Sequence, residues 1–221
     1  MGTIRLFIIE DQPAVLKSQL KVLSSFSDLT IMGAAMSAEE AITELLALDQ
    51  YPNVVLCDLG LPKMNGIEAT KRIKAMHASI EILMFTVFED EQKVLAAIKA
   101  GASGYLLKGA DAHRIHEAIV DVFHGGTVIQ PNLARRLLKH FSHGYDISQQ
   151  ENRDLKELLT VREIEVLQMI AKGLSNQEVA DVLKLSKATI RTHLEHIYQK
   201  LEVSNRVEAI TEGVRFGIIE L

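Results

Sequence analysis

The chain has 221 residues, of which 48% are hydrophobic and 24% charged, and its formal net charge at pH 7 is −5. This composition is ordinary for a globular protein, but the negative charge excludes a protein that coats nucleic acid through a bulk basic surface. No apolar run approaches the roughly 20 residues of a membrane-spanning helix, and the first residues are too acidic for a signal peptide. With Cys57 as its single cysteine, the sequence predicts a cytoplasmic protein without an internal disulfide.

Apolar runs alternate with helix-period stretches over the first 124 residues. Runs of strand length lie at residues 5–9, 29–35, 54–57, 82–85 and 104–107. The stretches after them carry apolar residues three and four positions apart, as in Val15, Leu16, Leu20 and Leu23. This alternation predicts an α/β fold, a (βα)5 doubly wound parallel sheet with helices on both faces.

The pattern changes after residue 124. One helix is predicted at 131–141, and the polar stretch 142–154 is typical of a linker. From residue 157 onward every periodic segment has the spacing of a helix, which predicts a small all-α domain. We therefore expect a first domain at 1–124, a linker with a short helix at 125–156 and a helical domain at 157–221.

Polar residues mark the predicted helix starts. The expected N-caps are Ser37 with Glu40, Thr160 with Glu163, Ser175 with Glu178, Ser186, and Ser204. Gly173 is placed as a C-cap.

Charged and hydroxyl side chains follow the ends of four predicted strands. They are Glu10, Asp11, Asp58, Thr86 and Lys108. Because parallel strands end at the same edge of a sheet, where ligands bind, we expect these groups to converge. Carboxylates clustered this closely repel each other unless a cation lies among them, and an all-oxygen ligand set suits Mg²⁺.

The same groups suggest a reaction. Asp58 can act as a nucleophile that accepts a phosphoryl group, while Mg²⁺ neutralises the transferring charge. Lys108 and the Thr86 hydroxyl can then bind phosphoryl oxygens. The alternative is that the acids are solvated loop charges.

Four segments of the first domain resemble the receiver domain of bacterial two-component response regulators. They are IIEDQP, VVLCDLGLPKMNGIEA, MFTVFED and GASGYLLKG. The resemblance implies that Asp58 is the phosphoacceptor and that Asp11, Asp58 and the carbonyl of Gly60 bind Mg²⁺, with Glu10 acting mainly through water. It also implies that Thr86 and Tyr105 form the switch pair and that Lys108 pairs with the phosphate.

Two residues depart from the usual receiver pattern. Val87 follows the switch threonine, where many receivers carry alanine or another small residue, so we expect slower hydrolysis of the phosphoryl bond than in a Val87→Ala variant. Gly109 follows the lysine, where many receivers carry proline, so the usual rigid turn is not expected.

The second domain contains two helix-period segments joined by a short turn near residues 184–186, as in a helix-turn-helix. The start of the second helix of such a motif reads base edges in the major groove, and Arg191 can form two hydrogen bonds to guanine. The candidate DNA-binding residues are Asn176, Lys184, Lys187, Thr189, Arg191, Thr192 and Glu195. A small helical domain without DNA binding is the alternative.

Over about 50 residues, LTVREIEVLQMIAKGLSNQEVADVLKLSKATIRTHLEHIYQKLEVSNRVEA resembles the LuxR-type helix-turn-helix. Joined behind a receiver, that domain defines the NarL/FixJ class of response regulators. Glu195 departs from the pattern, because basic residues are frequent at that position. In the family, the last helix joins two DNA-binding domains, which here implies Val207, Ile210 and Val214 as dimerisation residues. The alternative is that this helix packs only on its own domain.

The resemblance implies a non-enzymatic transcription regulator that a histidine kinase phosphorylates and that binds promoter DNA as a homodimer. Two other hypotheses remain open: a regulator of the same fold that works without phosphorylation, and an aspartyl-phosphate hydrolase. A hydrolase normally needs a second carboxylate two residues after the nucleophile, and Gly60 stands at that position here. The histidines have no shared metal-ligand spacing, so no zinc site is expected.

Overall fold

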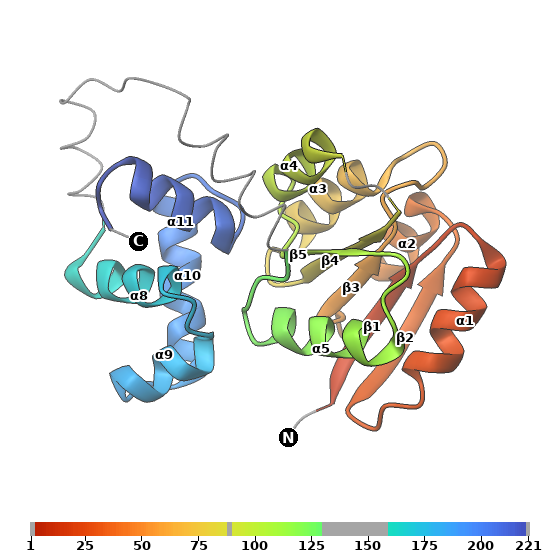
Figure 1. The fold of residues 1–221 in the computed structure, drawn as a ribbon, viewed down its shortest axis with the longest axis horizontal. Coiled ribbons are helices and arrows are strands. Elements are labelled where there is room, and N and C mark those ends of the chain that lie inside the picture. Colours follow the sequence, from red (N-terminus) through yellow and green to blue (C-terminus); the bar gives the residue numbers. More distant parts are fainter. Residues whose placement is uncertain (1–2, 88–89, 130–158, 220–221) are drawn as a thin grey trace. The chain divides into compact units, whose positions relative to one another are not determined.

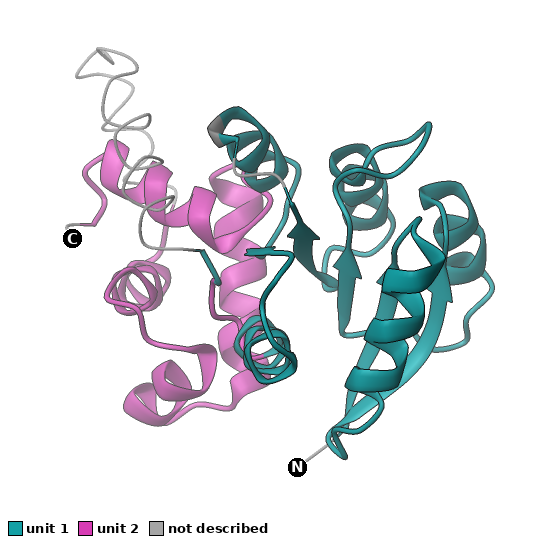
Figure 2. Cartoon of the chain, turned by 45° about the vertical axis from the view of Figure 1, so that its right-hand side comes forward, with its two compact units in different colours: residues 1–123, 128–130 teal, residues 124–127, 131–221 magenta. Residues whose placement is uncertain are grey.

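The computed structural model describes residues 3–87, 90–129 and 159–219 (Figure 1). The chain forms two compact units, one of residues 1–123 and 128–130 and one of residues 124–127 and 131–221 (Figure 2). The predicted helix 131–141 and linker 142–154 lie outside the described residues. The predicted domain boundaries therefore stay predictions.

The first unit contains the predicted parallel sheet. Its strands are β1 (Ile4–Ile9), β2 (Leu29–Ala35), β3 (Val54–Cys57), β4 (Glu81–Thr86) and β5 (Gly104–Leu107). Within the described residues they pair in the order β2-β1-β3-β4-β5, and every pairing is parallel. The fold prediction is thus confirmed, and β4 extends one residue beyond the predicted run at each end, from Glu81 to Thr86.

Helices cover both faces of the sheet (Figure 1). They are α1 (Pro13–Leu23), α2 (Ala38–Leu46), α3 (Gly66–Met76), α4 (Glu91–Lys99) and α5 (Ala112–Phe123). Helices α1 and α5 lie on one face, and α2, α3 and α4 on the other. Alternate residues of the inner strands, such as Leu6, Ile8 and Leu56, form the core beneath α1 and α5 with Ile115 and Ile119. Burial of both faces explains why the strands are continuous apolar runs.

The buried stripe of α1 differs from the predicted apolar set. The helix begins with Pro13 at its first turn and buries Leu16, Gln19 and Leu23, whereas Val15 and Leu20 are only half-buried. An amide side chain therefore occupies a core position on this helix.

In the second unit, the described helices are α8 (Val161–Ala171), α9 (Asn176–Leu183), α10 (Lys187–Lys200) and α11 (Arg206–Arg215). Their apolar faces share one core that includes Val166, Leu167, Val179, Ile190 and Ile197. Within residues 3–87, 90–129 and 159–219, no helix is both long and apolar enough to span a membrane.

Most predicted caps are confirmed. Thr160 and Ser175 form capping boxes with Glu163 and Glu178, and the Ser186 hydroxyl accepts a hydrogen bond from the backbone of Thr189. The Ser37 hydroxyl also caps α2.

Three details of the caps were predicted wrongly. The carboxylate of Glu40 accepts from the backbone of Met36, not Ser37. Helix α11 is capped by Asn205, whose side chain accepts from the backbone of Glu208, so Ser204 is not the N-cap. Gly173 follows the C-cap of α8 and has a φ of 90°, which favours glycine.

Candidate functional site

The order of the strands brings the three acids together. Strand β1 lies beside β3, and Ile9 pairs with Cys57, so the residues that follow, Glu10 and Asp58, leave the sheet next to each other. Oxygen atoms of Glu10, Asp11 and Asp58 all lie within 4.8 Å of one another. Because β2 lies on the far side of β1, this position is the switch point of the sheet, where α/β folds bind ligands.

Lys108, which follows β5, reaches this acid cluster. Its Nζ donates to Asp58 Oδ2 at 2.8 Å and to Glu10 Oε1 at 2.9 Å, and it lies 2.8 Å from Glu10 Oε2. Its backbone N–H donates to the carbonyl of Thr86 at 2.7 Å, which aligns the end of β5 with the end of β4. Burial alone would lower the pKa of Lys108, but the hydrogen bonds that its ammonium donates to Asp58 and Glu10 raise the pKa overall, so the ammonium stays charged.

The acid cluster is held in a mostly dry position. Glu10 is 1% exposed and Asp58 5%, and burial raises the pKa of Glu10 despite the opposing effect of Lys108. Asp58 Oδ1 accepts from the backbone of Gly60 at 3.2 Å. Asp11 Oδ1 is buried and has no hydrogen-bond partner among the described residues. An orphaned buried carboxylate oxygen beside two further acids fits a hard divalent cation such as Mg²⁺.

The loop after Asp58 depends on glycine. A Cβ atom on Gly66 would lie 2.2 Å from the carbonyl oxygen of Asp58, so the start of α3 can approach this strand only without a side chain there.

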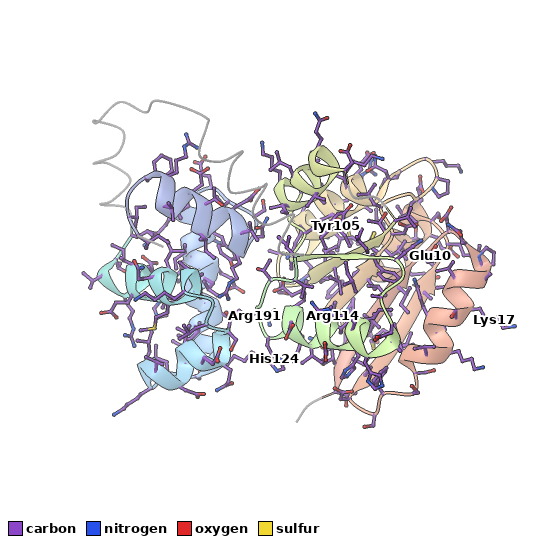
Figure 3. All side chains as sticks on the ribbon, viewed as in Figure 1. Glu10, Lys17, Tyr105, Arg114, His124 and Arg191 are labelled. Atoms are coloured by element: carbon purple, nitrogen blue, oxygen red, sulfur yellow. The ribbon has the colours of Figure 1, made fainter. Side chains whose placement is uncertain are left out.

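Thr86 and Tyr105 lie on the neighbouring strands β4 and β5, and both are fully buried (Figure 3 labels Tyr105 and Glu10). Burial raises the pKa of the Tyr105 hydroxyl, with smaller contributions from Asp90 and Asp58. Tyr105 therefore occupies an inward position in this structure.

The two departures from the receiver pattern are visible at the same edge of the sheet. Val87, directly after β4, is 66% exposed. Gly109, after Lys108, has a φ of 111°, a value that the ring of a proline forbids. The backbone between β5 and α5 thus takes a path that a proline at this position could not follow.

The helix-turn-helix prediction has its expected geometry in the second unit. Lys184 adopts a left-handed conformation, φ 54°, and turns the chain between α9 and α10. Ile190, Leu194 and Ile197 face the core, which leaves Thr192 among the exposed residues of α10.

The other candidate DNA-binding residues differ in accessibility. Lys184 and Glu195 are exposed, whereas Lys187, Thr189 and Arg191 are half-buried. Burial and the neighbouring Arg191 lower the pKa of Lys187. The Thr189 hydroxyl is hydrogen-bonded to Ser186. Asn176 is 7% exposed, and its Oδ1 has no partner among the described residues, so its role as a phosphate contact stays a prediction.

The predicted dimerisation residues lie on α11. Ala209 and Gly213 face the core of the second unit, and Ile210 packs partly against it. Val207 is half-buried and Val214 is 36% exposed. Of the three predicted dimerisation residues, only Val214 is therefore on the exposed side of α11.

One residue at the site was not predicted from the sequence. Gln19 is buried on α1 and its amide donates to Glu10. A polar residue at a core position of a predicted amphipathic helix is the signal that would have found it.

Comparison with known proteins gives the family. Residues 6–120 match the response regulator receiver domain, and residues 157–212 match the luxR family of bacterial regulatory proteins. The chain belongs to the two-component response regulators that join a receiver to a LuxR-type DNA-binding domain, the NarL/FixJ class. This family consists of transcriptional regulators rather than enzymes, so the hydrolase hypothesis is set aside.

Relatives match over nearly their whole length. Transcriptional regulatory protein LnrK of Bacillus subtilis (strain 168) is 34% identical over 220 residues, which cover 97% of this chain and 98% of LnrK. The crystal structure of response regulator ChrA of a heme-sensing two-component system has 35% identity and a TM-score of 0.51, and the match covers 99% of this chain and 100% of that chain. A structure of two RcsB dimers bound to two parallel DNAs has 25% identity and a TM-score of 0.54, and the match covers 97% of this chain and 99% of the RcsB chain.

Proposed function

We propose that Asp58 is the phosphoacceptor through which this transcriptional response regulator is controlled. The observation that carries the proposal is the position of Asp58 at the end of β3, 2.8 Å from Lys108 and beside Glu10 and Asp11. In the reaction, a carboxylate oxygen of Asp58 forms a bond to phosphorus, and the phosphoryl group leaves the imidazole nitrogen of a histidine kinase or the acetate of acetyl phosphate.

Asp11, Asp58 and the carbonyl of Gly60 would hold Mg²⁺ directly, with Glu10 acting mainly through water. The orphaned Asp11 Oδ1 supports this arrangement. When bound, Mg²⁺ supplies positive charge that neutralises the transferring group.

Lys108 then changes its partner. Its ammonium leaves Asp58 and pairs with a phosphoryl oxygen, because the phosphoryl group carries about −1.5 to −2 charge near neutral pH. The Thr86 hydroxyl binds another phosphoryl oxygen, and Tyr105 is held in its buried position beside it. The rearrangement alters the surface formed by β4, α4, β5 and α5.

The second unit carries the output. Helix α10 enters the major groove, where Arg191 and Thr192 face base edges and Lys184, Lys187, Thr189 and Asn176 hold phosphates. Glu195 accepts a hydrogen bond from a cytosine amino group or repels a phosphate. The preferred DNA sequence therefore differs from that of family members with a basic residue at this position.

The active form is a homodimer on promoter DNA, joined through Val207, Ile210 and Val214 on α11. The DNA-bound dimers of RcsB support this part of the proposal. The proposed partners are a sensor histidine kinase and promoter DNA, and the proposed location is the cytoplasm, where promoter DNA is accessible.

Intact mass after incubation with acetyl phosphate and Mg²⁺ tests the proposal. We expect one added phosphate in the wild type and in Asp121→Asn, an exposed aspartate of α5, but none in Asp58→Asn. DNA gel shifts with the same samples should strengthen on phosphorylation only where the adduct forms. A wild type without an adduct that still binds DNA would instead establish the regulator that works without phosphorylation.

A further inference from the structure

Gln19 occupies a position where the helix periodicity calls for an apolar residue. It lies between Leu16 and Leu23 on the buried stripe of α1 and is 6% exposed. Burying an amide costs free energy unless it is hydrogen-bonded, so a glutamine at this position needs a specific partner.

That partner is Glu10. Gln19 Nε2 donates to Glu10 Oε2 at 3.2 Å, and both side chains are buried. The Gln19 Oε1 atom is buried without a partner among the described residues, so the contact with Glu10 is where this amide recovers part of its desolvation cost. Because the acceptor is a carboxylate, the hydrogen bond is stronger than one between two neutral groups when Glu10 is ionised.

The other donors to Glu10 are less able to fix its orientation. Lys108 divides its ammonium between Glu10 and Asp58, and the backbone N–H of Gln12 is 3.4 Å from Glu10 Oε1. Under the proposed function, on which this inference rests, Lys108 moves to the phosphoryl group. Gln19 is then the side-chain donor that stays with Glu10 throughout the reaction.

We propose that Gln19 is a positioning residue for magnesium binding: its amide anchors Glu10 Oε2 and leaves Oε1 directed toward the water shell of the cation. Glutamate has one more rotatable bond than aspartate, so a glutamate at this position requires an anchor to present one oxygen. The anchored conformation exists before the cation arrives, which lowers the ordering cost of binding. Partners that orient metal-binding groups typically change metal affinity by about 10- to 100-fold.

Titration of Mg²⁺ alone by isothermal calorimetry tests the inference. Gln19→Met keeps a long unbranched side chain without the donor, and Leu23→Met alters the same buried stripe one turn further along. We expect Mg²⁺ to bind about tenfold more weakly to Gln19→Met, with Leu23→Met within twofold of the wild type. Gln19→Asn, which keeps the amide but is one methylene shorter, should also bind Mg²⁺ more weakly than the wild type. It replaces Gln19→Met in the titration if that variant does not fold.

A structural role and a positioning role are separated by a double-mutant cycle. In a Glu10→Gln background, Gln19→Met should cause no further loss of Mg²⁺ affinity, because the residue acts through Glu10. In thermal unfolding without metal, followed by circular dichroism, the midpoint temperature of Gln19→Met should be no lower than that of Leu23→Met.

Two results would overturn the inference. The first is equal Mg²⁺ affinity of folded Gln19→Met and wild type. The second is a loss of Mg²⁺ affinity on Gln19→Met substitution that is equally large in the wild-type and the Glu10→Gln backgrounds. If either occurs while the wild type still gains phosphate at Asp58, the role of Gln19 is refuted and the proposed function is unaffected. If the wild type binds no Mg²⁺, both fail.

Discussion

The ammonium of Lys108 lies 2.8 Å from Oδ2 of Asp58, although the two residues are 50 positions apart in the chain. The same ammonium contacts Glu10, so one cation partly neutralises two buried acids. Metal binding and this ion pair therefore oppose each other at the same carboxylates.

Replacing Lys108 by methionine should increase magnesium affinity about tenfold, or about 1.4 kcal/mol, because the three acids then have no competing cation. Without the metal, the variant should be destabilised by about 3 kcal/mol, since Asp58 and Glu10 remain buried without their partner. Calorimetric Mg²⁺ titration and thermal unfolding with and without Mg²⁺ measure both effects. Lys99→Met, which removes an exposed lysine of α4, is the matched control. Equal magnesium affinities of Lys108→Met and wild type would contradict the prediction.

Shortening Val87 should speed the loss of the phosphoryl group. The side chain directly follows Thr86, the last residue of β4, and is larger than the alanine that many receivers carry there, so we expect it to restrict the approach of water to a phosphorylated Asp58. We expect the adduct of Val87→Ala to decay several-fold faster, on the order of 1 kcal/mol in barrier height, as followed by intact mass after removal of acetyl phosphate. Val182→Ala, an exposed valine of α9, should match the wild type. Equal lifetimes of the Val87→Ala and wild-type adducts would rule out this role.

Arg191 and Lys184 should affect DNA binding in different ways, although each substitution by alanine removes one positive charge. Arg191→Ala should lose about 1–3 kcal/mol of binding to genomic fragments selected by the phosphorylated protein, with little loss on random DNA. Lys184→Ala should weaken both equally and lower the slope of log affinity against log salt by about one. Gel shifts at several salt concentrations distinguish the two. A uniform loss for both variants would assign Arg191 to the phosphate backbone.

The second unit should lose stability in acid through Glu163. Burial would raise the pKa of this carboxyl, but hydrogen bonds from Lys200 and Thr160 lower it overall. A lowered folded-state pKa contributes stability that is present above the unfolded value, near 4.5, and is lost as pH falls through the lower folded value.

Glu163→Gln should therefore lower the unfolding free energy of this unit by about 1–2 kcal/mol at pH 7 and by less below pH 4. Hydrogen exchange of α8 and α10 amides in the full chain measures this, with Glu165→Gln, an exposed residue of the same helix, as control. A destabilisation that is the same at both pH values would argue against the ionised pair with Lys200.

Val214→Lys should weaken dimerisation without unfolding α11. Val214 is 36% exposed on the helix, and a charge there is costly only when a second copy covers it. Analytical ultracentrifugation of the phosphorylated protein should give a dimer dissociation constant about tenfold higher, equal to about 1.4 kcal/mol. Val161→Lys, at a 77% exposed position of α8, should leave the dimer dissociation constant unchanged. A Val214→Lys protein that dimerises like the wild type would favour packing of α11 on its own unit only.

The hydrophobic periodicity and the polar residues that follow the strands were sufficient to predict the sheet and the acid cluster. Parallel strands are buried on both faces, so their apolar runs are visible in the sequence, and the acids stand directly after them. The shared edge of the parallel strands also predicted that Lys108 lies near Asp58, but the direct 2.8 Å contact between them depends on the register and side-chain packing, which the sequence does not give.

The errors have local causes. Ser204 and Asn205 are both good capping residues, and only the backbone geometry decides that Asn205 caps α11. Gln19 was passed over because apolar spacing was counted on Val15, Leu16, Leu20 and Leu23, while a buried amide is recognisable only once its partner Glu10 is located.

Cys57, the chain's single cysteine, is the last residue of the central strand β3, pairs with Ile9 of β1 and is fully buried. Burial raises the pKa of its thiol, so little thiolate forms while the strand is in place. An alkylating reagent can therefore mark this sulfur only in molecules whose sheet has opened, and the rate of labelling reports the opening of the receiver without interference from a second thiol. The strand that precedes the proposed phosphoacceptor thus contains an internal probe of its own unfolding.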